Sequence, residues 1–269
     1  MLRHLFVVCA CAAPIATLAA QSAEDERWLA TCREEWHGWR DKHCEVRVSM
    51  LRATGSTIAV DPGKNGAVAV KGWDRDSIEV HARIQTQASS DAEAVDLARL
   101  VRVAISGRTI RVDGPTSGRE AAWGVSFVVF VPRHSDLDLE TYNGPIAVRE
   151  VSGRMTLTAY NGPVALRGVG GDVHAHTTNG PLSIDLTGAH WDGAGLDAQT
   201  TNGPVDLGVP EDYSAQLEFG TVNGPLTLDF PLTVTIQGRV GRRITAALGR
   251  GGAPVRAVTT NGPVALHRN

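Results

Sequence analysis

The sequence predicts an all-β fold, a flattened parallel β-helix or solenoid with coils about 18–23 residues long. The first observation is the motif Asn-Gly-Pro, followed each time by a short run of alternating apolar residues. It begins at Asn143, Asn161, Asn179, Asn202, Asn223 and Asn261, with spacings of 18, 18, 23, 21 and 38 residues. The second observation is another turn midway between copies, as at Val151-Ser152-Gly153. Each coil therefore holds two short strands, whose apolar faces are buried when coils stack.

The turn residues themselves favour stacking. The glycine indicates either a positive φ or a close backbone approach, and the proline fixes φ where a strand begins. Equivalent asparagines of adjacent coils are expected to form a ladder of side-chain amides. The threonine that stands two residues before the asparagine in five copies is expected to form a hydroxyl column. Asn-Gly is also a two-residue hairpin turn, so an antiparallel β-sandwich is the alternative. The turn recurs only once per two strands, which favours the β-helix.

The N-terminal residues 1–20 resemble a secretory signal peptide. A basic start at Arg3 and His4 precedes an apolar segment, and small residues including Ala19 and Ala20 end it. Acylation at Cys11, as in a lipoprotein, is disfavoured because Cys9-Ala10 is an atypical lead-in. No other apolar stretch is long enough to span a membrane, so no transmembrane span is expected in the mature chain. The predicted location is periplasmic or at the cell surface.

Residues 21–44 predict a helical cap. Within residues 24–43 a helical stripe of three tryptophans and one cysteine covers an apolar surface, which we interpret as the first coil of the solenoid: Trp28, Cys32, Trp36 and Trp39. An aromatic sugar-binding face is the alternative. In an exported chain, Cys32 and Cys44 predict a disulfide worth about 3 kcal/mol.

Residues 45–269 predict a single solenoid domain. Strands are expected at residues 45–51, 57–60, 67–70, 78–84, 109–112 and 125–131, and Asn65-Gly66 begins a degenerate copy of the repeat. A short helix interrupts the strands at residues 90–103, where Ser90 and Glu93 form a capping box. The expected inward residues of the regular array are Ile146, Val148, Met155, Leu157, Val164, Leu166, Val173, Ala175, Leu182, Ile184, Val205, Leu207, Leu226, Leu228, Val264 and Leu266.

The repeat resembles the "putative-adhesin" domain family of exported bacterial proteins, DUF4097. The residues that carry the resemblance are the turn and strand at 177–184, Thr-Thr-Asn-Gly-Pro-Leu-Ser-Ile, and the turn at 169–173, Val-Gly-Gly-Asp-Val. The resemblance covers residues 45–269 and implies a β-helix-like fold in the cell envelope. It brings no catalytic residues. The proline after most Asn-Gly turns and the tryptophan-rich N-terminus depart from the family pattern.

Two groups of side chains are candidate sites. Asp172, His174 and His176 project from one strand face and are weak candidates for a metal site, because alternate positions spread over about 13 Å. The C-terminal arginines are a candidate anion patch, in which neighbours point to opposite faces: Arg239, Arg242, Arg243, Arg250 and Arg256. The alternative in both cases is a solvated surface. No cofactor is expected.

The predicted function is non-catalytic: an adhesin-like rigid binding or structural scaffold of the cell envelope. The partner is expected to be an envelope glycan, a lipid headgroup or a protein. A net charge of −3 argues against nucleic acid. The first alternative is an envelope-stress or regulatory accessory protein that binds a partner protein. A carbohydrate-active β-helix enzyme is the second, and it is disfavoured because the acidic residues stand singly rather than in pairs.

Overall fold

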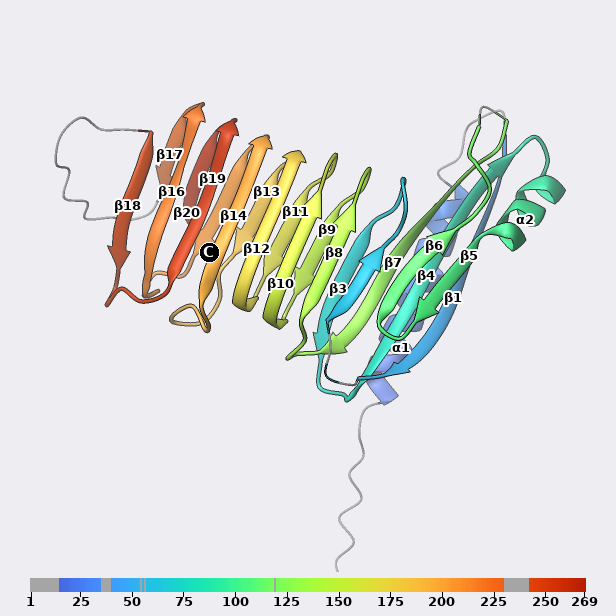
Figure 1. Ribbon diagram of the computed structural model, residues 1–269, viewed down its shortest axis with the longest axis horizontal. Coiled ribbons are helices and arrows are strands. Elements are labelled where there is room, and N and C mark those ends of the chain that lie inside the picture. The colour runs from blue at the N-terminus through green and yellow to red at the C-terminus, as the bar shows by residue number, and fades with distance from the viewer. Residues whose placement is uncertain (1–14, 35–39, 54, 56, 119, 230–241) are drawn as a thin grey trace, which may run out of the picture.

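Two mixed β-sheets of ten strands face one another in the computed structural model, which describes residues 15–34, 40–53, 55, 57–118, 120–229 and 242–269 (Figure 1). Sheet A contains, in spatial order, β1 (Asp41–Arg52), β4 (Ser77–Ala88), β7 (Ala122–Pro132), β3 (Val68–Trp73), β9 (Ile146–Arg149), β11 (Val164–Arg167), β13 (Leu182–Asp185), β15 (Val205–Val209), β20 (Val264–Arg268) and β17 (Leu226–Asp229). Sheet B contains β18 (Arg243–Leu248), β16 (Ala215–Asn223), β19 (Pro254–Asn261), β14 (Gly195–Asn202), β12 (Gly170–Asn179), β10 (Ser152–Ala159), β8 (Leu137–Thr141), β2 (Ile58–Asp61), β6 (Thr109–Asp113) and β5 (Arg102–Ser106).

Each repeat supplies one strand to each sheet, and equivalent strands of successive coils pair in parallel. Met155 of β10 is in register with Val173 of β12, and Val164 of β11 is in register with Leu182 of β13. All four side chains are buried between the sheets. The predicted β-solenoid is therefore confirmed, and the antiparallel sandwich is wrong for this array. Among the expected inward residues, Leu228 is 42% exposed because it lies on β17, the last strand of sheet A.

The repeated turns form a continuous ladder along the solenoid. Asn161 donates its amide to Oδ1 of Asn143 at 3.0 Å, and Asn179 donates to Asn161 at 2.9 Å. The ladder extends from Asn65, in the degenerate copy, through all six regular copies. The threonines of adjacent coils are in register, as Thr177 and Thr200 are, so they form the expected column. Each hydroxyl donates to a glycine carbonyl, as Thr177 does to Gly162 at 2.8 Å, and not to the next hydroxyl.

Close approach of the backbone explains the glycine of the motif. A Cβ atom added at Gly180 would lie 2.1 Å from the carbonyl oxygen of Gly162, well inside van der Waals contact. The equivalent glycines of the other coils stack in the same way. A residue with a side chain would force adjacent coils apart at this turn.

The last coil in sequence is not the last in space. Strand β19 pairs with both β14 and β16, and β20 pairs with both β15 and β17. The C-terminal coil therefore lies between two coils that precede it in the chain. The amide ladder follows the spatial order, because Asn261 bonds to Asn202 at 2.8 Å and to Asn223 at 2.9 Å.

Pairing becomes antiparallel at both ends of the solenoid. Strands β1, β4 and β7 are antiparallel at one end, and β16 and β18 at the other. Helix α2 (Asp91–Leu100) covers the first end beside β1 and β4 (Figure 1), with Ala94 and Ala98 buried. Ser90 caps it as predicted, but the residues that follow form β5, which the sequence pattern missed.

The N-terminal helix differs from the prediction in extent and position. Helix α1 (Ile15–Glu34) is followed after residues 35–39 by β1, so residues 41–44 are strand rather than helix. The reason is that β1 pairs along its whole length with β4. The expected packing of Trp36 and Trp39 lies outside the described residues, as does most of the predicted signal peptide. Helix α1 also lies on the outer face of sheet A, as described below, rather than over the end of the solenoid.

Within the described residues, no helix combines the length and apolar character needed to cross a membrane.

Candidate functional site

The candidate site begins with a row of positive charges on the outer face of sheet A. The sixth residue after the repeat asparagine is Lys71, Arg149 and Arg167 in three consecutive coils. These residues are in register on β3, β9 and β11. Their strand neighbours Val70 and Val148 are buried between the sheets, so the three cations point outward. Further along the solenoid the row continues with Asp185.

Helix α1 is held beside this row by buried and half-buried charges. Glu24 accepts from Nζ of Lys71 at 2.6 Å and from Arg83 at 3.3 Å. Asp25 accepts from Nε of Arg83 at 2.9 Å and contacts Nδ1 of His81. Charged groups removed from water are tolerated only when paired, so these contacts fix the position of the helix on the sheet.

A second carboxylate lies on the opposite side of the imidazole. Oε1 of Glu79 is 2.7 Å from Nε2 of His81. Glu79 is 2% and His81 4% exposed, and both point away from the main core. His81 also packs edge-on against Phe130, with ring centroids 5.5 Å apart. The charges under α1 therefore adjoin an aromatic surface.

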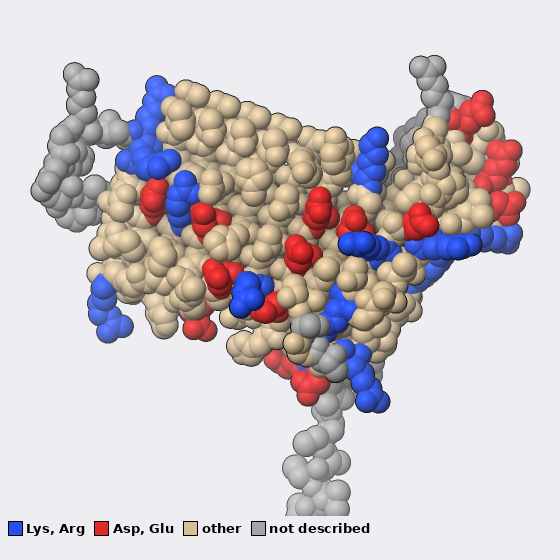
Figure 2. Space-filling model, in the orientation of Figure 1, with Lys and Arg blue, Asp and Glu red and all other residues tan. Residues whose placement is uncertain are grey.

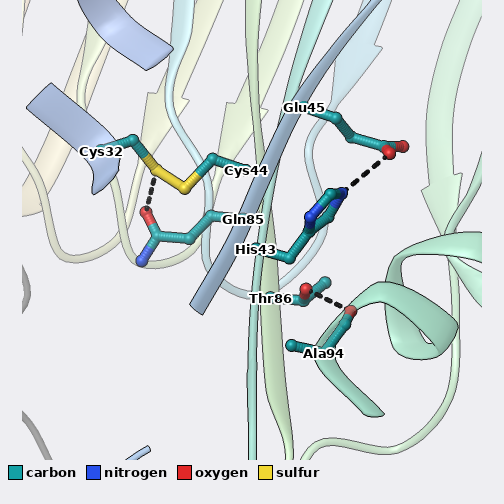
Figure 3. Close-up of a disulfide and its surroundings, with 7 residues drawn as sticks. All are labelled: Cys32, His43, Cys44, Glu45, Gln85, Thr86 and Ala94. Atoms are coloured by element: carbon teal, nitrogen blue, oxygen red, sulfur yellow. Dashed lines mark hydrogen bonds and ion pairs between the residues drawn. A yellow bond between two sulfur atoms is a disulfide. The ribbon is translucent and has the colours of Figure 1, made fainter. Parts of the chain in front are cut away.

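A disulfide ties the C-terminal part of α1 to β1. Cys32 and Cys44 are bonded, which confirms the predicted pairing, and both are buried (Figure 3). Sγ of Cys32 also lies 3.8 Å from Oε1 of Gln85 on β4. The bond closes a loop of twelve residues and restricts how far the helix can leave the sheet.

A groove of about 620 Å³ lies where α1, β3, β7 and β9 meet. Trp73 and Phe130 form its apolar floor, with ring centroids 5.5 Å apart. Trp73 is oriented by a hydrogen bond from Nε1 to the carbonyl of Ser77 at 2.8 Å. The guanidinium of Arg75 lies 4.7 Å from the centre of the Trp73 ring. The groove thus combines aromatic surface with a few placed charged groups, as small-molecule sites do.

One wall of the groove contains an unusual backbone conformation. Glu150 has φ of 56°, and no other non-glycine residue in the described ranges has a positive φ. Bulky residues in this conformation are strained, and such strain concentrates at functional sites. The carbonyl of Glu150 also lies against Gly72, where an added Cβ would be 1.8 Å from the oxygen. The conformation of Glu150 and the close approach of its carbonyl to Gly72 together fix this turn.

Arg133 holds the side chain of Glu150. Its Nη1 donates to Glu150 at 2.6 Å, and its Nε donates to Asp74 at 2.7 Å. The hydrogen bond and charge of Arg133 lower the pKa of the Asp74 carboxyl. Burial raises the pKa of Glu24, but Lys71 and Arg83 outweigh burial and lower it overall. Asp74 and Glu24 therefore stay ionised near neutral pH, which suits a charged binding wall better than general-acid catalysis.

The remaining cations of the row are uncompensated. Arg149 lines the groove, and Arg167 lines an adjoining hollow that shares Arg133 and Glu150 with it. Neither Arg149 nor Arg167 has an ion-pair or hydrogen-bond partner for its side chain within the described residues. Gln21 of α1 also lines the groove, and its Oε1 is buried without a protein partner there. The arrangement can receive an anion.

The candidates from the sequence lie elsewhere. Asp172, His174 and His176 are on the outer face of sheet B, where Nε2 of His174 lies 3.2 Å from Asp172. The described part of the chain contains no group of three His, Cys, Asp or Glu side chains suited to a metal ion.

Ion pairs with acidic side chains neutralise part of the candidate anion patch. Arg256 pairs with Asp197 at 2.6 Å and with Glu218 at 3.4 Å, and Arg243 pairs with Glu218 at 3.3 Å. Arg242 donates to a backbone carbonyl. The backbone N–H of Arg250 donates to Oγ of Ser214 at 3.3 Å, and Arg239 lies outside the described residues. Figure 2 shows acidic and basic side chains interspersed over the middle of the visible face, where sheet B lies in front.

The groove residues carry no obvious motif. Lys71 and Arg149 are 78 residues apart, and each alone is typical of a solvated strand. Alignment of the degenerate copy at Asn65 with the regular copies would have placed Lys71, Arg149 and Arg167 in one row. No comparable signal marks His81 or Glu79.

Comparison with known proteins gives a family and distant structural likenesses. The family described as Toastrack DUF4097 matches residues 38–267. A "putative cell adhesion protein" from Clostridium sporogenes is similar in structure at 8% identity and a TM-score of 0.43, over 84% of this chain and 100% of that one. A "putative adhesin" from Bacteroides fragilis is similar at 9% identity and a TM-score of 0.35, over 84% and 97%. A "putative lipid binding protein" from Parabacteroides distasonis is similar at 10% identity and a TM-score of 0.25, over 84% and 97%. No curated protein matches the sequence.

Proposed function

The chain belongs to the Toastrack DUF4097 family, and from its groove on sheet A we propose that it is an exported, non-catalytic binding scaffold of the cell envelope. The solenoid serves as a rigid support, and the groove between α1 and sheet A is the binding site. The single observation that carries the proposal is the strained Glu150 turn beside two uncompensated arginines. The next coil makes the same turn with a glycine, Gly168, at φ of 59°, so Glu150 carries a side chain where the conformation favours glycine.

The rigidity of the support follows from the ladder. Amide and backbone hydrogen bonds repeat from coil to coil, the hydroxyl hydrogen bond repeats in the five copies that have the threonine, and a continuous core lies between the sheets. Sites on such rigid elements hold their geometry without reorganisation. The site then needs little ordering when a partner arrives, which favours affinity.

Export is supported by the N-terminal pattern and the disulfide. Disulfides persist in oxidising compartments, and this one fixes the helix that forms one wall of the groove. We place the protein in the periplasm or at the cell surface. A binding role rather than catalysis is supported by the groove carboxylates Glu24, Asp74 and Glu150, which are all tied to cations.

The test is co-sedimentation of the chain, purified from an exporting host, with bacterial envelope vesicles. We expect wild-type protein to sediment with the vesicles and Trp73→Ala to lose most of this binding. Tyr142→Ala is the matched control, because Tyr142 is an exposed aromatic residue at the turn of the solenoid. Equal binding by wild type and Trp73→Ala would refute the groove as the site.

Protease treatment of the vesicles distinguishes the kinds of partner. Binding that survives the treatment indicates a glycan or lipid headgroup. Binding that is lost indicates a partner protein, as in the regulatory alternative. Incubation of the same protein with a panel of neutral and acidic polysaccharides tests the non-catalytic assignment, because cleavage that depends on a groove carboxylate would contradict it.

A further inference from the structure

We propose that the groove and the adjoining hollow together bind a phosphate-bearing organic molecule, with the phosphoryl group at Arg149 and Arg167 and the organic part on Trp73 and Phe130. This inference rests on the proposed binding function of the same face and names the chemistry of its ligand.

The two arginines are in an arrangement that folding alone does not favour. They are in register on adjacent parallel strands, whose backbones lie about 4.8 Å apart. Like charges at this spacing repel one another. Two other cations of the sheets are compensated: Lys71 by Glu24 in the same row, and Arg256 by Asp197 and Glu218 on sheet B. Arg111 and Arg154 on sheet B have no ion pair within the described residues, but they do not lie side by side on adjacent paired strands. Asp185 follows Arg167 in register, yet no ion pair joins them.

A phosphoryl group fits this pair better than a carboxylate. Each guanidinium presents a planar fork of N–H donors, and a phosphate offers three terminal oxygens that two forks can share. The carboxylate of Glu24, bound to Lys71 at 2.6 Å, shows that the row already holds an anion one coil away. An anion at Arg149 and Arg167 would extend the same pattern along the row.

The organic part has an apolar floor and a polar contact beside it. Trp73 and Phe130 point outward from β3 and β7. Lys71 on β3 is in register with Phe130 on one side and with Arg149 on the other. Gln21 also lines the groove, and its Oε1 is buried without a protein partner in the described ranges. A ligand hydroxyl reaches this oxygen only when the Gln21 side chain rotates toward the groove. The ligand class is therefore a glycerol phosphate or sugar phosphate, either free or as a lipid headgroup.

The test is isothermal titration of the full chain with inorganic phosphate and with glycerol 3-phosphate, and sedimentation with phosphatidic acid or phosphatidylcholine vesicles. We expect glycerol 3-phosphate to bind at least about ten-fold more tightly than inorganic phosphate, because its organic part can also contact the aromatic floor. The variant Arg149→Gln/Arg167→Gln should weaken binding at least about ten-fold, since charge-assisted hydrogen bonds are lost. Both arginines are exposed, so circular dichroism should show an unchanged fold.

The matched control is Arg111→Gln/Arg154→Gln on the strands of sheet B, which removes the same charge from the other side of the solenoid. Binding of glycerol 3-phosphate in solution identifies a soluble phosphate ester. Binding only of phosphatidic acid vesicles identifies a lipid headgroup. Both outcomes support the inference.

Three results would overturn it: no binding of any phosphate, unchanged binding by Arg149→Gln/Arg167→Gln, or an equal loss in the control variant. Envelope binding without phosphate binding would remove this inference and leave the proposed function standing. Phosphate binding without envelope binding would contradict the proposed envelope function and leave the phosphate site standing.

Discussion

Substitution of Gly180 by alanine tests how tightly the coils are stacked. The new Cβ would lie 2.1 Å from the carbonyl oxygen of Gly162, whereas ordinary contacts begin at 3.4 Å. The adjacent coils must therefore separate by more than an ångström at this turn. Three hydrogen bonds cross this junction: Thr177 to Gly162 at 2.8 Å, Asn179 to Asn161 at 2.9 Å, and Val164 N–H to the Pro181 carbonyl at 3.0 Å.

The expected magnitude follows from these bonds. Each contributes about 1 kcal/mol net, so their loss should lower the free energy of unfolding by about 3 kcal/mol. Urea denaturation followed by circular dichroism measures this change. Gly118→Ala is the matched control, because an added Cβ there meets nothing within 4 Å, and it should change stability by less than about 0.5 kcal/mol. If Gly180→Ala were as stable as Gly118→Ala, the close stacking of the coils would be refuted.

Three further predictions concern the ladder, the disulfide and the charges under α1. Asn179→Ala should cost about 1–2 kcal/mol in urea denaturation, because Asn179 donates to Asn161 and accepts from Asn202; an unchanged midpoint would show that the amide ladder contributes nothing. Reduction of Cys32–Cys44 should accelerate amide hydrogen exchange in α1 and leave β10 and β12 protected, since the bond joins α1 only to β1; uniform acceleration would contradict local tethering. The pKa of Glu24 is below its ordinary value of 4.5 because Lys71 and Arg83 outweigh burial, so its contribution to stability is present above about pH 4.5 and is lost as pH falls below that value. Glu24→Gln should therefore show a shallower loss of stability between pH 5 and 3 than wild type, and identical pH profiles would rule out this ion pair as a source of acid sensitivity.

The repeat allowed the parallel array to be predicted, because the same residues recur in every coil and can satisfy one another. The order of coils could not be predicted for the same reason. The copies at Asn202, Asn223 and Asn261 are nearly equivalent, so their sequences do not specify which coil lies between the other two. The long interval before Asn261 is the one sign of an altered connection.

The position of α1 was predicted wrongly because the stripe of Trp28 and Cys32 identifies a packed face but not its partner. The partner is set by Glu24 and Asp25, which pair with Lys71 on β3 and Arg83 on β4, both distant from the helix in the sequence. The groove eluded prediction for a similar reason. Its residues come from α1 and three strands, and sheet register alone brings them together.

Amide hydrogen exchange of the full chain, with and without bacterial envelope vesicles, tests most directly whether the groove is the functional face. The account predicts added protection confined to residues 71–75, 130–133, 149–150 and 167, which contribute to the groove and the adjoining hollow. Residues 138, 156 and 174, on the outer face of sheet B, should exchange at unchanged rates. Protection on sheet B or along the asparagine ladder, with none at the groove, would contradict it.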